Sequence, residues 1–149
     1  MTRSTLYLIN VASLQTLGHK GPRDGHLTIQ ARPQWFAKGL GRVNVLAPLG
    51  ALEDLMLAAI EERRSGIGSH YAMLRYRAEY EHHLAQNDLR PHRLVVSPFP
   101  GTIGCYLVED GDTLTCTCSK FVDCHRRWAA PYLVKAGWRV ILDGVEVTV

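Results

Sequence analysis

The segment "TCTCSKFVDCHRR", residues 115–127, contains three of the four cysteines of the chain, one histidine and two arginines. Thiolates and imidazoles act as metal ligands and nucleophiles, whereas guanidinium groups bind anions. Three hypotheses fit this composition. The segment forms a metal site, or it holds a reactive thiolate beside an anion-binding site, or its cysteines are buried as small apolar residues.

The metal hypothesis depends on ligand spacing. Zinc prefers sulfur and nitrogen ligands, and the segment offers Cys116, Cys118, Cys124 and His125. Structural zinc sites usually take their ligands from two separated pairs, and the adjacent Cys124 and His125 would point in different directions. A tetrahedral site would therefore need a ligand from elsewhere, such as His19 or His26. We predict no resident metal and keep a zinc-structured protein as an alternative.

The thiolate hypothesis depends on the expected start of a helix at Cys124. Backbone N–H groups and the macrodipole at a helix N-terminus stabilise thiolates and bind anions. Arg126 adds a positive charge that suits a phosphate or a carboxylate. If the protein is an enzyme, we expect Cys124 to be the nucleophile, His125 to carry protons and Arg126 to bind the anionic ligand.

Burial is the third hypothesis, since cysteines are among the most buried residues in proteins. We assign Cys105, which stands alone in "TIGCYLV", to packing. Cys116 and Cys118 fit packing and function equally well at the end of a strand. The contiguous Cys124, His125 and Arg126 favour function, because three polar or reactive residues seldom share a helix start without a ligand.

Strands and helices alternate along the chain. Apolar runs predict strands at residues 5–12, 26–30, 41–48, 92–99 and 138–142. Apolar residues at helical spacing predict helices within residues 51–66, 69–87 and 124–137, with Ser69 and Asp123 as N-caps and Pro131 kinking or shortening the last helix. Asp-Gly pairs at residues 110–111 and 143–144 predict two hairpins. This order predicts an α/β fold, one domain over residues 1–149, with a partly parallel twisted sheet flanked by helices and an antiparallel C-terminal hairpin.

In α/β folds, ligands bind where strands end and loops lead into helices. Residues 116–126 lie at such a junction. A long loop rich in glycine and basic residues, residues 19–32, is expected to cover the site, with His19, Lys20 and Arg32 contacting the ligand together with Cys116 and Cys118. A solvated loop without a ligand is the alternative. The expected ligand is an anionic small molecule, and a nucleotide is the first candidate.

Composition limits the class of protein. Hydrophobic residues make up 46% and charged residues 21% of the 149 residues, as in globular proteins. The net charge of +3 permits anionic ligands without indicating nucleic acid by itself. No apolar run is long enough for a membrane span and no signal peptide is evident, which predicts a cytoplasmic protein with reduced thiols. A second hypothesis is a non-catalytic module that binds nucleotide or nucleic acid through Arg32, Trp35, Lys38 and Arg42.

The C-terminal segment "LTCTCSKFVDCHRRWAAPYLVKAGWRVILDG", residues 114–144, resembles the signature of the DUF488 family. In these small intracellular α/β proteins, an apolar strand leads to Cys-x-Cys, and a short acidic loop then leads to a Cys-His-Arg that opens a helix. Residues 32–50 and 76–84 are similar to other family segments more faintly. The chain differs in having "FVD" before the Cys-His-Arg and no clear Asp-x-Arg after "LYLINVA". The family has no established function, so the resemblance implies a fold and a site but no reaction or cofactor.

Overall fold

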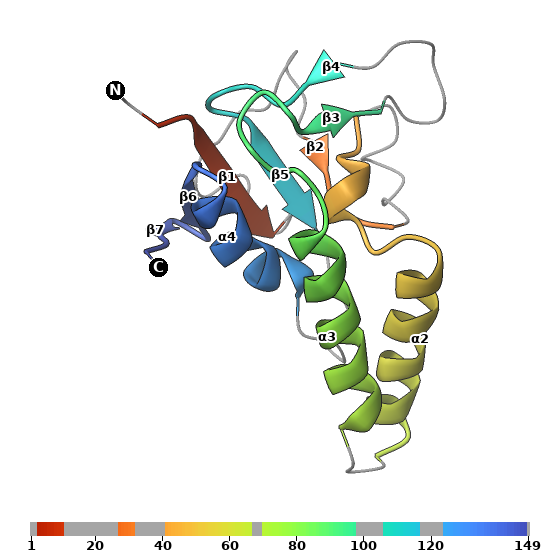
Figure 1. Ribbon diagram of the computed structural model, residues 1–149. Helices are drawn as coiled ribbons and strands as arrows, with labels where there is room; N and C mark the ends of the chain where they lie inside the picture. Colours follow the sequence, from red (N-terminus) through yellow and green to blue (C-terminus); the bar gives the residue numbers. More distant parts are fainter. Residues whose placement is uncertain are drawn as a thin grey trace.

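The computed structural model describes residues 3–10, 27–31, 41–66, 70–97, 106–116 and 124–148. It confirms the predicted α/β class, with helices and strands alternating along the chain (Figure 1). The helices are α2 (Ala51–Arg64), α3 (Tyr71–Ala85) and α4 (His125–Lys135), and a short 3-10 helix, η4, spans Asn44–Leu46. None of the described helices is long and apolar enough to cross a membrane.

The main sheet has β1 (Thr5–Asn10) at its centre. β1 pairs in parallel with β5 (Thr113–Cys116) on one side and with β6 (Arg139–Leu142) on the other. β2 (Leu27–Thr28) extends the sheet in parallel beyond β5, and β7 (Val145–Glu146) adds an antiparallel strand beside β6. The order β2-β5-β1-β6-β7 confirms both the partly parallel sheet and the antiparallel C-terminal hairpin.

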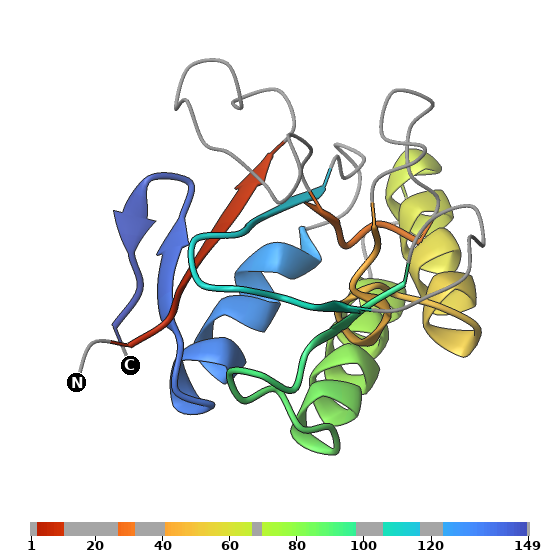
Figure 2. The same ribbon diagram turned by 90° about the horizontal axis from the view of Figure 1, so that it is seen from above.

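The helices form a second layer. α4 packs against β1 and β6, α3 packs beside α4, and α2 lies alongside α3 (Figure 2). The predicted apolar stripe of α3 is confirmed, because Met73, Tyr76, Tyr80 and Leu84 are all buried. Tyr76 meets Trp128 of α4 edge to face, with ring centroids 5.0 Å apart. Aromatic contacts therefore join α3 to the helix that begins at the Cys-His-Arg motif.

The predicted strand at residues 41–48 is wrong. Arg42 alone keeps sheet pairing, through isolated bridges to Thr28 and Ser97, and the chain then turns into η4. The backbone N–H of Leu46 donates to the carbonyl of Val43 at 3.0 Å, which closes the turn. Val43 and Leu46 are both buried, and this spacing of three residues suits a 3-10 turn rather than a strand.

The predicted hairpin around residues 110–111 is also wrong in its pairing. The turn is present, with Gly111 at φ 91°. β5, however, joins the parallel sheet, whereas β4 (Tyr106–Leu107) pairs with β3 (Val95–Val96) in a separate two-stranded sheet. All four β5 residues are buried, whereas both β4 residues are partly or well exposed, so the two segments suit different environments.

Two expectations about helix ends are corrected. His70, with φ 56°, is the N-cap of α3, and Cys124 is the N-cap of α4, whereas the expected caps Ser69 and Asp123 lie outside the described residues. Pro131 does not shorten α4, which continues to Lys135. Residues before and after the proline are buried, so tertiary packing holds α4 together across the missing backbone donor.

Candidate functional site

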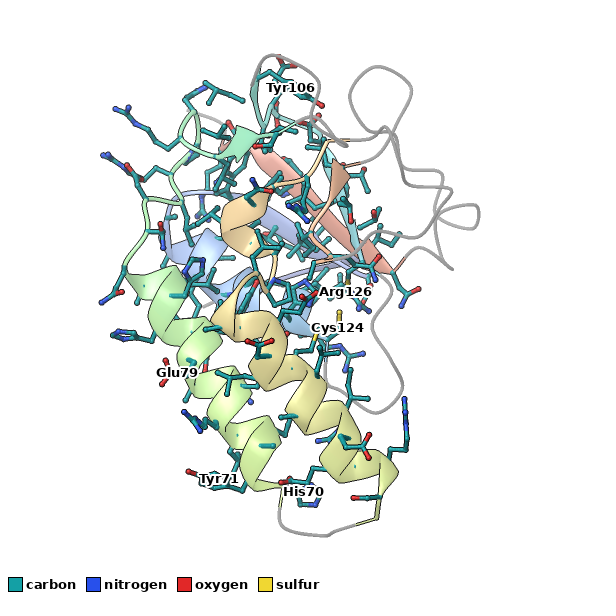
Figure 3. The ribbon with its side chains drawn as sticks, turned by 90° about the vertical axis from the view of Figure 1, so that its right-hand side faces the viewer. His70, Tyr71, Glu79, Tyr106, Cys124 and Arg126 are labelled. Carbon is teal, nitrogen blue, oxygen red and sulfur yellow. The ribbon has the colours of Figure 1, made fainter. Side chains whose placement is uncertain are left out.

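The predicted junction lies where the parallel strands end. Asn10, the last residue of β1, is the register partner of Cys116, the last residue of β5. Asp143 directly follows β6, whose residues also pair with β1. α4 begins at this edge with Cys124 as its N-cap, and Figure 3 shows Cys124 and Arg126 close together there. Parallel pairing therefore gathers residues from three strand ends and one helix start.

Cys116 and Cys124 meet at this edge. Their Sγ atoms lie 2.8 Å apart, and either thiol can donate its proton to the other sulfur. Neither cysteine is part of a disulfide. Cys116 is fully buried, whereas Cys124 keeps 9% of its surface exposed. Two cysteines that the sequence placed on a strand and on a helix start thus form one pair of thiols, which we call the dithiol.

Arg126 connects the dithiol to the end of β6. Its Nη1 lies 3.6 Å from the Cys116 sulfur, while Nε and Nη2 donate to the two carboxylate oxygens of Asp143 at 3.1 and 2.8 Å. Burial opposes the charge on Arg126, but the hydrogen bonds to Asp143 and the neighbouring sulfurs outweigh it and raise the pKa. A permanent positive charge is therefore fixed beside Cys116.

Asp143, which the sequence predicted only as a turn former, belongs to the same cluster through its ion pair with Arg126. It adopts a left-handed conformation, with φ 49°, and Gly144 follows with φ 87°. Its backbone N–H donates to the carbonyl of Leu8 at 2.9 Å, which fixes the turn to β1. The carboxylate thereby faces Arg126. The sequence alone gives no signal for the pairing of Asp143 with Arg126, because that pairing depends on β6 lying in the same sheet as β5.

His125 points to the other side of the site. Its Nε2 lies 2.7 Å from the carbonyl oxygen of Ile29, just after β2, and because a carbonyl only accepts, this nitrogen carries the proton. The ring is buried and meets Tyr80 edge to face at 5.6 Å. Burial lowers the pKa of His125 and thus favours the neutral imidazole. His125 therefore anchors the start of α4 to the segment after β2.

Of the predicted site residues, the structure describes Cys116, Cys124, His125 and Arg126. Cys118, Arg32, Lys20 and His19 lie outside the described residues. Arg42, from the nucleic-acid hypothesis, donates from Nε to Asn44 and from Nη1 to the carbonyl of Ala31, both at 2.7 Å. Within the described part of the chain, no group of three or more histidine, cysteine or acidic side chains could hold a metal ion.

Comparisons with family models, with curated proteins and with solved structures each gave no match. The resemblance to the DUF488 family therefore depends on the residues quoted above. The dithiol, Arg126 and Asp143 are the described residues whose contacts bear on function.

The protonation of His125 predicts how stability changes with pH. In the unfolded chain a histidine accepts a proton below about pH 6.5, whereas in the folded protein burial resists it. The unfolded state then binds more protons, so the stability present above that pH is lost as pH falls, by up to about 1.4 kcal/mol per pH unit from this group. Chemical denaturation between pH 8 and pH 5, a range that includes the ordinary pKa of histidine, measures the slope of the free energy of unfolding against pH. His125→Gln should flatten it, whereas the matched variant His82→Gln on exposed α3 surface should not. Equal slopes in both variants would contradict the assignment.

The Arg126–Asp143 ion pair should contribute measurably to stability. Asp143→Asn suits the left-handed backbone but removes the charge, leaving Arg126 buried without a counter-ion. We expect a loss of about 1 to 2 kcal/mol in the free energy of unfolding, since Asp143 is one third exposed. Arg126→Met should cost about 2 kcal/mol. The double variant should cost less than the sum, and strict additivity in urea unfolding would show that the pair is not coupled.

Proposed function

We propose that the protein is a cytoplasmic, DUF488-like thiol protein whose dithiol acts on an anionic small molecule. One observation carries the proposal: the sulfurs of Cys116 and Cys124 lie 2.8 Å apart, and Nη1 of Arg126 lies 3.6 Å from one of them. The positive charge of Arg126 interacts with both Cys124 and Cys116, and a cation beside the two sulfurs favours a thiolate, which is the nucleophilic form. Nucleotides are the first ligands to test because they combine a phosphate with a small size.

The start of α4 supplies the second electrostatic contribution. The helix has eleven residues and no acidic side chain in its first turn, and Cys124 makes no side-chain capping hydrogen bond. The first backbone N–H groups of a helix have no intrahelical acceptors and attract negative charge. A thiolate at Cys124 and an anionic ligand in front of it would both be stabilised there.

The contacts assign more specific roles than the sequence did. Cys124 is the proposed nucleophile, because it is the more exposed of the two thiols. Arg126 uses two of its nitrogens on Asp143, so in this proposal it acts on the sulfurs and leaves anion binding to the helix N-terminus. His125 has its Nε2 on the carbonyl of Ile29, so it positions α4 instead of carrying protons from that nitrogen.

The non-catalytic nucleic-acid module has less support. Of its four proposed contact residues, Arg42 is the one that the structure describes, and its guanidinium donates to Asn44 and to the carbonyl of Ala31. These internal contacts hold Arg42 in the turn that precedes η4. The thiol hypothesis is therefore the one we pursue.

A reactive thiolate at Cys124 predicts fast alkylation. With iodoacetamide at pH 7, we expect Cys124 to react on the order of 10-fold faster than N-acetylcysteine. Peptide mass spectrometry measures the rate at which Cys124 is alkylated. Arg126→Gln should reduce the rate, whereas Arg126→Lys, which keeps the charge, should reduce it less. Cys105→Ser is the control, because Cys105 is assigned to packing and its loss should leave the alkylation rate of Cys124 unchanged. A Cys124 that reacts no faster than N-acetylcysteine in the folded protein would refute the nucleophile.

The anionic ligand predicts a thermal shift. A ligand at about 100 times its Kd stabilises the folded state by about 2.7 kcal/mol, which corresponds to several degrees in Tm. We expect nucleoside mono- or triphosphates or pyrophosphate to raise Tm, and adenosine, which lacks a phosphate, to leave it unchanged. Potassium chloride at matched ionic strength controls for screening. If adenosine shifts Tm as much as its phosphates, or if no phosphate compound shifts Tm at all, the anionic ligand is wrong.

A further inference from the structure

We infer that the dithiol reduces small hydroperoxides, with Cys124 as the thiolate that is oxidised and Cys116 as the thiol that resolves it in a reversible disulfide. The inference rests on the proposed function because both need a reactive Cys124, and it goes beyond that function because a hydroperoxide is a neutral substrate and not the anionic ligand. It adds a substrate class and a second chemical role, for Cys116.

Contact between the sulfurs is what disulfide formation requires. A disulfide bond is about 2.0 Å long, and the two Sγ atoms already lie 2.8 Å apart without a bond between them. Cys116 is held in a buried strand that is paired on both sides, and Cys124 caps a helix whose start is anchored by His125 and Arg126. A small displacement of side chains, without rearrangement of the sheet, would join the sulfurs.

Unequal exposure separates the roles and selects the oxidant. Cys116 is fully buried and Cys124 keeps 9% of its surface. A protein disulfide must bring its own backbone to the attacking sulfur, which a residue with only 9% of its surface exposed hardly permits. Hydrogen peroxide and small alkyl hydroperoxides are little larger than water and can reach such a sulfur. The site therefore selects a small peroxide as the oxidant and Cys124 as the first sulfur to react.

The reaction balances with the groups present and one named oxidant. The Cys124 thiolate attacks the outer oxygen of ROOH, the O–O bond breaks, and Cys124 becomes a sulfenic acid while RO⁻ leaves. RO⁻ takes the proton of the Cys116 thiol and leaves as ROH. The Cys116 thiolate then attacks the Cys124 sulfur, the S–O bond breaks, and hydroxide leaves and is protonated by solvent. Two thiols have been oxidised to a disulfide and the peroxide has been reduced to ROH and water.

Arg126 suits the second half of this sequence. When Cys116 loses its proton, the new thiolate lies within 3.6 Å of Nη1, and Asp143 keeps the guanidinium in place. The negative charge therefore forms beside a fixed positive charge in a buried site, where such an interaction is strongest. Two equivalents of a small thiol return the dithiol by exchange, entering at the more exposed Cys124 sulfur.

The experiment uses the reduced full chain with one equivalent of hydrogen peroxide. We expect loss of two thiols per chain and a mass decrease of about 2 Da, for two hydrogens, with both changes reversed by dithiothreitol. Tryptic peptides should link the segment that ends at Lys120 to the one that contains Cys124. That first segment, residues 94–120, also contains Cys105 and Cys118. The map is therefore repeated with Cys105→Ser and with Cys118→Ser, and the link must persist in both if Cys116 is the partner.

Three further variants test the order of the steps. Cys116→Ser should stop at the sulfenic acid, which dimedone traps on Cys124. Cys124→Ser should lose the fast reaction with peroxide, and Cys105→Ser, the matched control, should keep it and the disulfide. A disulfide that involves Cys118 or Cys105, or direct passage of wild-type Cys124 to sulfinic acid, would overturn the inference. Circular dichroism of each reduced variant confirms that it folds.

The two proposals fail in distinguishable ways. If Cys124 alkylates rapidly but peroxide gives no disulfide between Cys116 and Cys124, the peroxidase inference is wrong and the reactive thiolate stands. If Cys124 is as slow as N-acetylcysteine with iodoacetamide and with peroxide, both proposals are wrong. A rate with peroxide at least about 10-fold above that of N-acetylcysteine, followed by the predicted disulfide, supports both.

Discussion

The ion pair between Arg126 and Asp143 is the interaction on which the geometry of the site depends. Removing a guanidinium from water is costly unless its hydrogen bonds are replaced, and here the two oxygens of one carboxylate accept from two of its nitrogens. The pair ties the first turn of α4 to the end of β6, while His125 ties the same turn to the segment after β2. Held on both sides of the sheet edge, the helix places Cys124 directly against Cys116.

The same pair decides which chemistry the arginine can perform. A guanidinium that faces solvent can bind a phosphate with two parallel hydrogen bonds. Here a carboxylate of the chain occupies that face, so the charge is directed inward to a sulfur. The positive charge thereby biases the protonation of a buried thiol. In the proposed function, the anion would be bound by the backbone N–H groups at the start of α4, which attract negative charge in any sequence. A motif of three consecutive residues, Cys-His-Arg, thus sends its side chains to three different neighbours.

Local patterns predicted much of this fold. The stripe of α3 and the Asp143-Gly144 turn depend on neighbours within a few residues, and both are confirmed. The prediction failed where partners are distant. The apolar run at residues 41–48 looks the same for a strand and for a turn that buries Val43 and Leu46, and the turn at residues 110–111 does not reveal that β4 and β5 pair in different sheets. At the site, the residue types indicated thiol chemistry. The partners of Arg126 and His125 could not be predicted, because they depend on the order of the strands in the sheet and not on the spacing of residues within the motif.

The position of β1 has a consequence for how the protein acquires its structure. This strand precedes its partners β5 and β6 by about 100 residues or more, a separation typical of slow-folding topologies. Until β5 and β6 have been synthesised, the apolar β1 segment has no strand partners for its backbone groups. Such exposed segments are prone to aggregate. The dithiol forms only when α4 packs on β1 and β6, because Cys124 is the N-cap of that helix and Cys116 ends β5. In the proposed function, the reactive thiolate would therefore be absent from the growing polypeptide and would form only once α4 has packed on the sheet.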